Sequence, residues 1–217
     1  MRKIFLLVFT LFLISCSKQI FNQKWTHEKA PDNFIARFET TKGNFDIEIT
    51  RDGSPMAVDR FYQLVHHHFY DNTIFYRAVP NFVVQFGNGD TIQTHKWDKF
   101  KVPDEKVKMS NLKGALSYAR SGEETRGNDL FINLKDNQRL DTVNYEKVRG
   151  FPAFGKVIKG MEVVEAIYTG YSNETMEKYD SLSPNRTEFL KTFPKLDLLH
   201  KVYVLKKVNK IKTKPTP

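Results

Sequence analysis

Apolar and polar residues alternate along two stretches early in the chain, 34–40 and 44–50, which are separated by Thr41-Lys42-Gly43. A period of two is typical of a strand that buries one face, and a short turn with a glycine joins such strands into a hairpin. Runs rich in aromatic and β-branched residues predict the remaining strands, at 74–79, 82–86, 115–120, 130–134, 153–158 and 199–208.

Two segments instead have apolar residues three or four positions apart, which is the spacing of an amphipathic helix. The first begins at Ser54-Pro55, an N-cap residue followed by a proline suited to the first helical turn, and continues to Val65. The second spans 160–167. Many strands with two helices predict a mainly β fold, a closed antiparallel eight-stranded barrel capped by two α-helices, because closure removes exposed strand edges.

Long polar stretches separate these elements within one domain that we place at 34–208. We expect loops at 88–113 and 135–153 and a polar surface insertion at 169–196. His66-His67-His68 ends the first helix, where histidines suit the negative end of the helix dipole. Consecutive residues point in different directions around a helix, so we expect no metal site there.

The N-terminus combines a short basic opening, an almost wholly apolar run over 4–14, and Ser15. The run is shorter than the ~20 residues that a transmembrane helix requires. Basic residues before a short apolar region that ends in small residues are typical of a signal peptide. A first core strand or helix is the alternative. The pattern favours a signal peptide at 1–15.

Leu13-Ile14-Ser15-Cys16 also resembles a bacterial lipobox, in which the cysteine is lipid-modified. Cys16 is the only cysteine in the sequence, and a lone thiol in an oxidising compartment has no internal partner. We therefore predict a lipoprotein signal peptide at 1–15, lipidation of Cys16 and a tether over 16–33. The protein would then be anchored to a bacterial membrane in the cell envelope, on the periplasmic side or at the cell surface.

The formal net charge is +9, and the densest basic run lies at the C-terminus. We predict a disordered basic tail over 209–217, with contact to anionic lipid or a cell-envelope polymer as the alternative. Positive charge is also typical of proteins that bind nucleic acid. An exported lipoprotein does not meet nucleic acid, so we expect no such partner.

The segment Phe75-Tyr76-Arg77…Pro80-Asn81-Phe82…Gln85-Phe86-Gly87 places a cation, a large ring and an amide in two short strands joined by a Pro-Asn turn. On pattern alone, Arg77 is either an outward edge charge or a cation on the wall of an apolar site. The segment resembles the F-H-R-x-x-P-x-F-x-x-Q-G-G core of the cyclophilin-type peptidyl-prolyl cis–trans isomerases. Gly114-Ala115-Leu116-Ser117-Tyr118-Ala119 and Phe154-Gly155-Lys156-Val157 resemble later motifs of that family, and the N-terminus suggests a bacterial lipoprotein form.

The resemblance implies roles for individual residues. Arg77 matches the catalytic arginine of the family, and Gln85 matches the amide that positions this arginine and contacts the substrate backbone. The substrate-binding positions, which form the proline pocket and the adjacent groove, are Phe82, Val83, Ala119, Asp129, Phe131, Leu140 and Phe151. Without the resemblance, Phe82, Phe131 and Leu140 would be interpreted as ordinary barrel core.

Several positions depart from the family pattern. Asp129 replaces a glutamine, and a carboxylate near Arg77 could form an ion pair that competes with the substrate. Arg139 replaces an aromatic residue and would remove one wall of the proline pocket. Arg120 replaces an asparagine, and Tyr76 replaces the histidine beside the arginine.

The sequence thus leads to two functional hypotheses. The first is a peptidyl-prolyl isomerase that assists the folding of exported proteins, without cofactor or metal, as a monomer whose partners are proline-containing polypeptides. The second is a module that binds proline peptides with little or no catalysis. The presence of Arg77, Phe82 and Gln85 together favours the first hypothesis.

Overall fold

The predicted N-terminal hairpin is present as β1 (Asn33–Thr40) and β2 (Gly43–Thr50). The two strands pair in antiparallel register, with Phe38 opposite Phe45, and these rings stack in the core with their centroids 4.7 Å apart. The fold is that of a computed structural model, which describes residues 21–88, 91–182 and 184–207.

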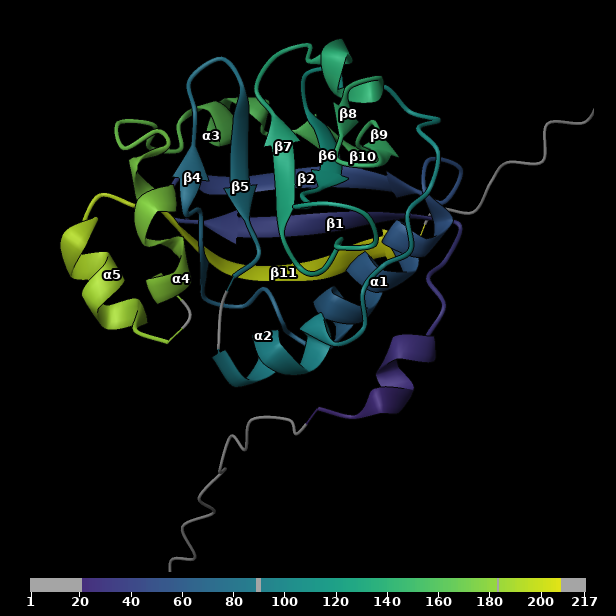
Figure 1. Cartoon of the computed structure of the whole chain (residues 1–217), viewed down its shortest axis with the longest axis horizontal. Helices are drawn as coiled ribbons and strands as arrows, with labels where there is room; N and C mark the ends of the chain where they lie inside the picture. The colour runs from purple at the N-terminus through teal and green to yellow at the C-terminus, as the bar shows by residue number, and fades with distance from the viewer. Residues whose placement is uncertain (1–20, 89–90, 183, 208–217) are drawn as a thin grey trace, which may run out of the picture.

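The hairpin belongs to a strongly curled antiparallel sheet of nine strands, in the order β3-β11-β1-β2-β10-β6-β7-β5-β4 (Figure 1). The mainly β fold is therefore confirmed. The edge strands β3 and β4 are consecutive in the chain but do not pair with each other, so the curled sheet is not closed by hydrogen bonds there. The other strands are β3 (Thr73–Ile74), β4 (Arg77–Ala78), β5 (Val83–Phe86), β6 (Ala115–Tyr118), β7 (Leu130–Asn133), β10 (Ala153–Lys159) and β11 (Leu198–Lys207).

Both predicted helices are present, as α1 (Pro55–His66) and α3 (Met161–Glu165). Proline occupies the start of α1 as expected, but the Ser54 side chain makes no capping hydrogen bond. Glu105 replaces it, because its carboxylate accepts hydrogen bonds from the backbone N–H groups of Met56, at 3.0 Å, and Ala57, at 3.3 Å. A carboxylate also suits the positive end of the helix dipole.

The loop predicted over 88–113 is wrong in part, because it contains α2 (Thr91–Asp98). This helix is polar in composition, so no apolar period identifies it. Trp97 anchors it: the side chain is buried, and the Arg60 guanidinium lies 5.3 Å from the ring centroid. The connection over 135–153 contains η2 (Gln138–Asp141) and a small hairpin of β8 (Asn144–Tyr145) and β9 (Val148–Arg149).

The insertion over 169–196 is not merely a polar surface segment. It forms η3 (Glu174–Lys178), α4 (Tyr179–Leu182) and α5 (Arg186–Thr192), which lie beside the β4 edge of the sheet (Figure 1). Phe189, Phe193 and Leu196 pack with two residues of the sheet edge, Ile74 and Tyr76, in an apolar cluster of their own. Sparse large rings in a polar segment thus provide a second small core.

The structure describes the predicted tether over 16–33 from residue 21 onward, and this part docks on the domain. η1 (Gln23–His27) lies against α1, and the Trp25 ring stacks on the His67 ring with a centroid separation of 3.9 Å. The backbone N–H of Ala30 also donates to Asp59, at 2.8 Å. The predicted signal peptide, Cys16 and the basic tail over 209–217 lie outside the described residues.

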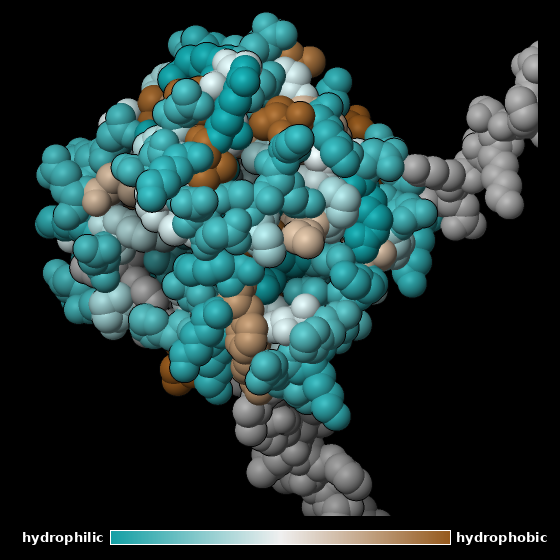
Figure 2. All heavy atoms as spheres, turned by 45° about the vertical axis from the view of Figure 1, so that its right-hand side comes forward, coloured by the Kyte–Doolittle hydropathy of each residue, from teal (hydrophilic) through white to brown (hydrophobic). Residues whose placement is uncertain are grey.

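In the parts of the chain that the structure describes, we find no helix with the length and apolar character needed to cross a membrane. Figure 2 shows one face covered mostly by hydrophilic residues, with hydrophobic residues in small separate groups. This face therefore offers no broad apolar surface.

Candidate active site

Arg77 and Gln85 are directly opposite each other in the pairing of β4 with β5. Opposite residues of an antiparallel pair project to the same face, and Arg77 Nη1 donates to Gln85 Oε1 at 3.0 Å. Arg77 Nε donates to Asn173 Oδ1 at 2.8 Å. These two amides hold the guanidinium from two sides.

The electrostatic setting of Arg77 leaves its charge uncompensated. Within the described residues, Arg77 makes no ion pair. Burial lowers the pKa of Arg77, yet a guanidinium remains protonated in proteins. The guanidinium carbon of Arg77, Cζ, lies 5.9 Å from the centroid of the Phe82 ring. A half-buried cation thus borders an apolar wall, and the interpretation of Arg77 as an outward edge charge is wrong.

That wall belongs to a pocket of about 330 Å³. Val83, Phe131 and Leu140 form an apolar cluster separate from the main core, and Phe82, Ala119 and Phe151 pack on it. Phe131 and Leu140 are thus buried in a small cluster of their own and not in the main core. The predicted site residues that line the pocket are Arg77, Phe82, Val83, Gln85, Ala119, Phe131, Leu140 and Phe151, and the sequence-derived set is brought together except for Asp129.

Asp129 does not line the pocket, and its predicted ion pair with Arg77 is wrong. Its carboxylate accepts hydrogen bonds from Tyr76 Oη at 3.2 Å and Tyr179 Oη at 2.8 Å. Burial raises the pKa of Asp129 to about 6, although the two hydroxyl donors act in the opposite direction. The Asp129 carboxylate is thus bound by Tyr76 and by Tyr179 of the insertion, and it does not compete with a substrate for Arg77.

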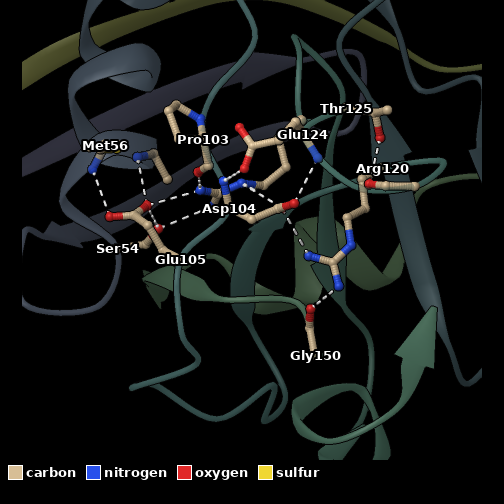
Figure 3. A network of polar contacts seen from close by, with 12 residues as sticks. Ser54, Met56, Pro103, Asp104, Glu105, Arg120, Glu124, Thr125 and Gly150 are labelled. Carbon is tan, nitrogen blue, oxygen red and sulfur yellow. Dashed lines mark hydrogen bonds and ion pairs between the residues drawn. The ribbon is translucent and has the colours of Figure 1, made fainter. Parts of the chain in front are cut away.

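Arg120 lies at the other end of the pocket. Its guanidinium is 4.6 Å from the Phe151 ring centroid, donates to the backbone carbonyl of Gly150, and contacts Asp104 at 3.4 Å. Figure 3 shows this guanidinium directed toward Gly150 and Asp104, next to the network that caps α1 through Glu105. Arg120 is thereby held as a rigid polar border of an apolar cavity.

Arg139, which is predicted to take the place of an aromatic wall residue, is not among the residues that line the pocket. Its exposed guanidinium lies 4.9 Å from the centroid of the Phe82 ring, a cation–π contact with one of the lining rings. Arg139 therefore contacts Phe82 without itself forming a wall of the pocket.

Three further residues at the site were not identified from the sequence. Tyr145, on β8, lines the pocket and has its ring 6.3 Å from that of Phe151. Asn173 and Tyr179 come from the insertion. All three residues lie in polar segments of the sequence, where nothing distinguishes them from ordinary surface residues.

A larger hollow of about 430 Å³ lies between α1 and β11, bordered by Tyr62, Val65 and Tyr203 among others. Its lining combines aliphatic residues with tyrosines, the exposed rings of His66 and His68, and two lysines, Lys206 and Lys207. The smaller pocket is the better candidate site, because a desolvated cation and an amide converge on its apolar floor.

Comparison with known proteins agrees with this geometry. The family model of cyclophilin type peptidyl-prolyl cis-trans isomerases matches residues 35–184. A peptidyl-prolyl cis-trans isomerase of Acinetobacter baylyi is 34% identical over 137 residues, which cover 62% of this chain and 72% of that protein. Peptidyl-prolyl cis-trans isomerase A of Dickeya dadantii is 35% identical over 130 residues, covering 59% of this chain and 67% of that protein.

Solved structures show the same fold. A cyclophilin type peptidyl-prolyl cis-trans isomerase of Cryptosporidium parvum superposes with a TM-score of 0.58 at 22% identity, covering 81% of this chain and 99% of that chain. A crystal structure of that protein in the presence of the dipeptide Ala-Pro gives a TM-score of 0.57 at 22% identity and covers 79% of this chain and 99% of that one. The chain therefore belongs to the cyclophilin-type peptidyl-prolyl cis–trans isomerase family.

Proposed function

We propose that this protein catalyses cis–trans isomerisation of X-Pro peptide bonds in the pocket beside Arg77. The observation that carries the proposal is a charged guanidinium, free of any ion pair among the described residues, at the border of an apolar pocket. The relatives named as peptidyl-prolyl isomerases support the reaction class.

The chemistry follows from the barrier of the reaction. Partial double-bond character of the C–N bond gives a rotation barrier of about 18–20 kcal/mol. In the twisted transition state this resonance is lost, and the proline nitrogen becomes a better hydrogen-bond acceptor. Arg77 supplies donors that cannot give up their proton. Within the described residues, Gln85 and Asn173 accept from Nη1 and Nε, so the donors on Nη2 remain for the substrate.

The apolar cluster of Val83, Phe131 and Leu140 would hold the proline ring while the preceding residue rotates. Because the donors of Arg77 are held in place before the substrate arrives, little reorganisation is needed at the transition state. Stabilisation of about 4–7 kcal/mol would accelerate isomerisation by roughly three to five orders of magnitude. No bond is broken, so the proposed step needs no nucleophile.

The cellular role is the second part of the proposal. X-Pro isomerisation takes tens of seconds and limits the folding of many chains. The apolar N-terminal run over 4–14, which is followed by Ser15 and Cys16, supports a lipid-anchored protein that assists the folding of exported proteins in the cell envelope. Its clients would be proline-containing polypeptides that cross the membrane unfolded.

A protease-coupled assay with a proline-containing peptide tests the activity. We expect wild-type protein to accelerate isomerisation and Arg77→Ala to lose at least about a hundredfold in kcat/KM, because a preorganised donor to the transition state is removed. Arg77→Lys should recover little, since lysine keeps the charge but not the planar set of donors.

Lys156→Ala is the matched control, because this cation is exposed on β10 and is not among the residues that line the pocket. It should behave as wild type. Equal isomerisation rates with and without the wild-type protein, together with measurable binding of the peptide, would instead identify a proline-peptide-binding module.

A further inference from the structure

Three side chains that commonly ligate metals meet away from the proline pocket, where the N-terminal segment crosses the end of α1. Glu28 follows η1, His66 is the last residue of α1, and His67 is its C-cap. Glu28 Oε2 lies 3.1 Å from His66 Nδ1, and Glu28 Oε1 lies 2.9 Å from His67 Nε2. The potential ligand atoms of the three residues are all within 4.8 Å of one another.

We propose that Glu28, His66 and His67 bind one divalent transition-metal ion of the zinc class. Tetrahedral zinc holds imidazole nitrogen at about 2.0–2.1 Å and carboxylate oxygen at about 2.0–2.2 Å, which places neighbouring ligand atoms roughly 3.3 Å apart. The two contacts of Glu28 with the histidine rings differ from this spacing by only a few tenths of an ångström. The ligand atoms of the three residues lie within 4.8 Å of one another, so the exposed His66 ring would turn toward His67 to complete the site.

The carboxylate side of the site is held in position by the fold. Gln63 Nε2, on α1, donates to the backbone carbonyls of Glu28, at 2.8 Å, and Thr26, at 3.1 Å. These hydrogen bonds fix the backbone of Glu28 relative to the helix that carries both histidines. Glu28 is 38 positions from His66 and 39 positions from His67 in the sequence, yet the fold holds the three side chains together as potential ligands.

The histidine side is equally well supported. The His67 side chain is 8% exposed, and its ring is sandwiched in nearly parallel stacking on Trp25, with an angle of 8° between the planes. The His66 side chain is 58% exposed, so the open side of the site faces solvent and water can complete the coordination shell.

The ligand set indicates the class of ion. Two imidazoles and one carboxylate suit Zn²⁺, Cu²⁺ or Ni²⁺, whereas Ca²⁺ and Mg²⁺ prefer oxygen ligands alone. Binding would fasten the N-terminal segment to α1 and stabilise the folded chain, because the three ligands are far apart once the chain unfolds. The site thus joins the body of the protein to the segment that leads toward the predicted lipid anchor.

Zn²⁺ titration of the full-length chain against a chromophoric chelator tests the site. All variants would carry Cys16→Ser, so that the thiol of the only cysteine contributes no ligand. We expect one tightly bound ion per chain. Glu28→Gln and His67→Asn should each weaken binding at least about tenfold, since even loss of an outer-shell partner has effects of this size.

His68→Asn is the matched control. His68 is the third histidine of the same run and also contacts a carboxylate, Asp71, at 3.1 Å, but it is not part of the cluster. Its substitution should leave the affinity unchanged. Affinity that falls in His68→Asn and not in Glu28→Gln would show that the exposed histidine run chelates the ion by itself, and would overturn the proposal, as would failure of the wild-type chain to bind Zn²⁺.

Trp25 provides a readout at the site itself. Cu²⁺ bound by His67 should quench the fluorescence of Trp25, whose ring centroid is 3.9 Å from that of His67. The ring centroid of Trp97, the other tryptophan of the sequence, is 6.3 Å from that of His67, so Trp25→Phe should retain quenching of Trp97 while Zn²⁺ still binds. Zn²⁺ should also raise the Tm of the wild-type chain and not that of Glu28→Gln. Quenching and a Tm shift that persist in Glu28→Gln would place the ion elsewhere and contradict the proposal.

Discussion

At the scale of single residues, the position of the Arg77 side chain depends on two amides that come from different parts of the chain. Gln85 lies opposite it in the β4–β5 hairpin, whereas Asn173 is 96 positions away in the insertion. A hydrogen bond to a charged group contributes about 1.5–3 kcal/mol when both partners are held in place. Asn173 is therefore a positioning residue for the proposed isomerase.

Asn173→Ala should lower kcat/KM roughly tenfold, mainly through kcat, because the guanidinium keeps its charge but loses one constraint on its orientation. Asn185→Ala is the control, since Asn185 caps α5 in the same insertion by accepting a hydrogen bond from the backbone N–H of Glu188. It should lower stability without a comparable loss of kcat. Equal losses of activity in both variants would show that the insertion acts only as a whole.

Asp129 predicts a pH dependence of stability. Its pKa is raised from 3.8 to about 6 in the folded chain, so the folded state binds the proton more tightly than the unfolded state does. The stabilisation is complete below about pH 4 and is lost as the pH rises through about 6.

Chemical denaturation at pH 5 and at pH 7 measures this effect. The denaturant midpoint of the wild-type chain should decrease from pH 5 to pH 7 by more than the midpoint of Asp129→Asn does. Asp129→Asn has no titrating group at this position. Asp136→Asn is the control, because Asp136 is exposed and its side chain only accepts a backbone hydrogen bond, from Lys113. Parallel midpoints for wild type and Asp129→Asn would contradict the raised pKa.

At the scale of elements, the insertion over 169–196 supports the site from outside the sheet. Ser172 forms a β-bridge with Ala78 on β4, and the Tyr179 ring lies 4.9 Å from the Tyr76 ring. The segment therefore covers the edge strand that holds Arg77, and it engages Asp129 through the Tyr179 hydroxyl. Exposed strand edges are prone to pairing with other chains, so the insertion also protects β4.

Phe193→Ala should loosen the packing of the insertion on the sheet edge. Phe193 is buried between Phe189 and Tyr171, with centroid separations of 5.0 and 5.1 Å. A buried Phe→Ala substitution costs about 3–5 kcal/mol. Hydrogen exchange should show loss of protection first in the insertion, accompanied by reduced isomerase activity. Met176→Ala, at an exposed apolar position of the same insertion, should change neither. Uniform loss of protection throughout the chain would argue against a separate small core.

At the scale of the whole molecule, lipidation at Cys16, which we propose, would determine where the catalytic domain works. The segment around Trp25 docks on the end of α1. The stretch of chain that could separate the domain from the membrane is therefore shorter than the predicted tether of 16–33. The domain would therefore operate close to the bilayer surface.

Cys16→Ser should release the protein into the soluble fraction after cell lysis, because lipidation would no longer be possible and a signal peptide alone does not anchor a mature chain. Ser17→Ala, at the adjacent position, should leave the protein in the membrane fraction. The measurement is fractionation followed by detection of the protein. Retention of Cys16→Ser in the membrane fraction would contradict the lipobox interpretation.

Much of the fold and of the pocket could be predicted from the sequence, for a local reason. Alternation over 34–50 and the apolar spacing after Pro55 express which face of each element is buried, and this pattern lies within the element itself. Arg77, Phe82 and Gln85 fall within one hairpin, so their proximity also follows from the order of residues. The helix α2 escaped prediction because a single residue, Trp97, anchors it.

Tertiary structure alone decided which distant partners these residues meet. Three sets of contacts join segments far apart in the chain. Asn173 bonds to Arg77, two tyrosines bond to the Asp129 carboxylate, and Glu28 contacts two histidine rings. Such contacts depend on how complete elements pack, and a side chain's own neighbours in sequence contain no record of them. The sequence by itself determined most strands of the sheet, the helices α1 and α3 and much of the pocket, whereas packing determined what holds Arg77 and where a metal ion could bind.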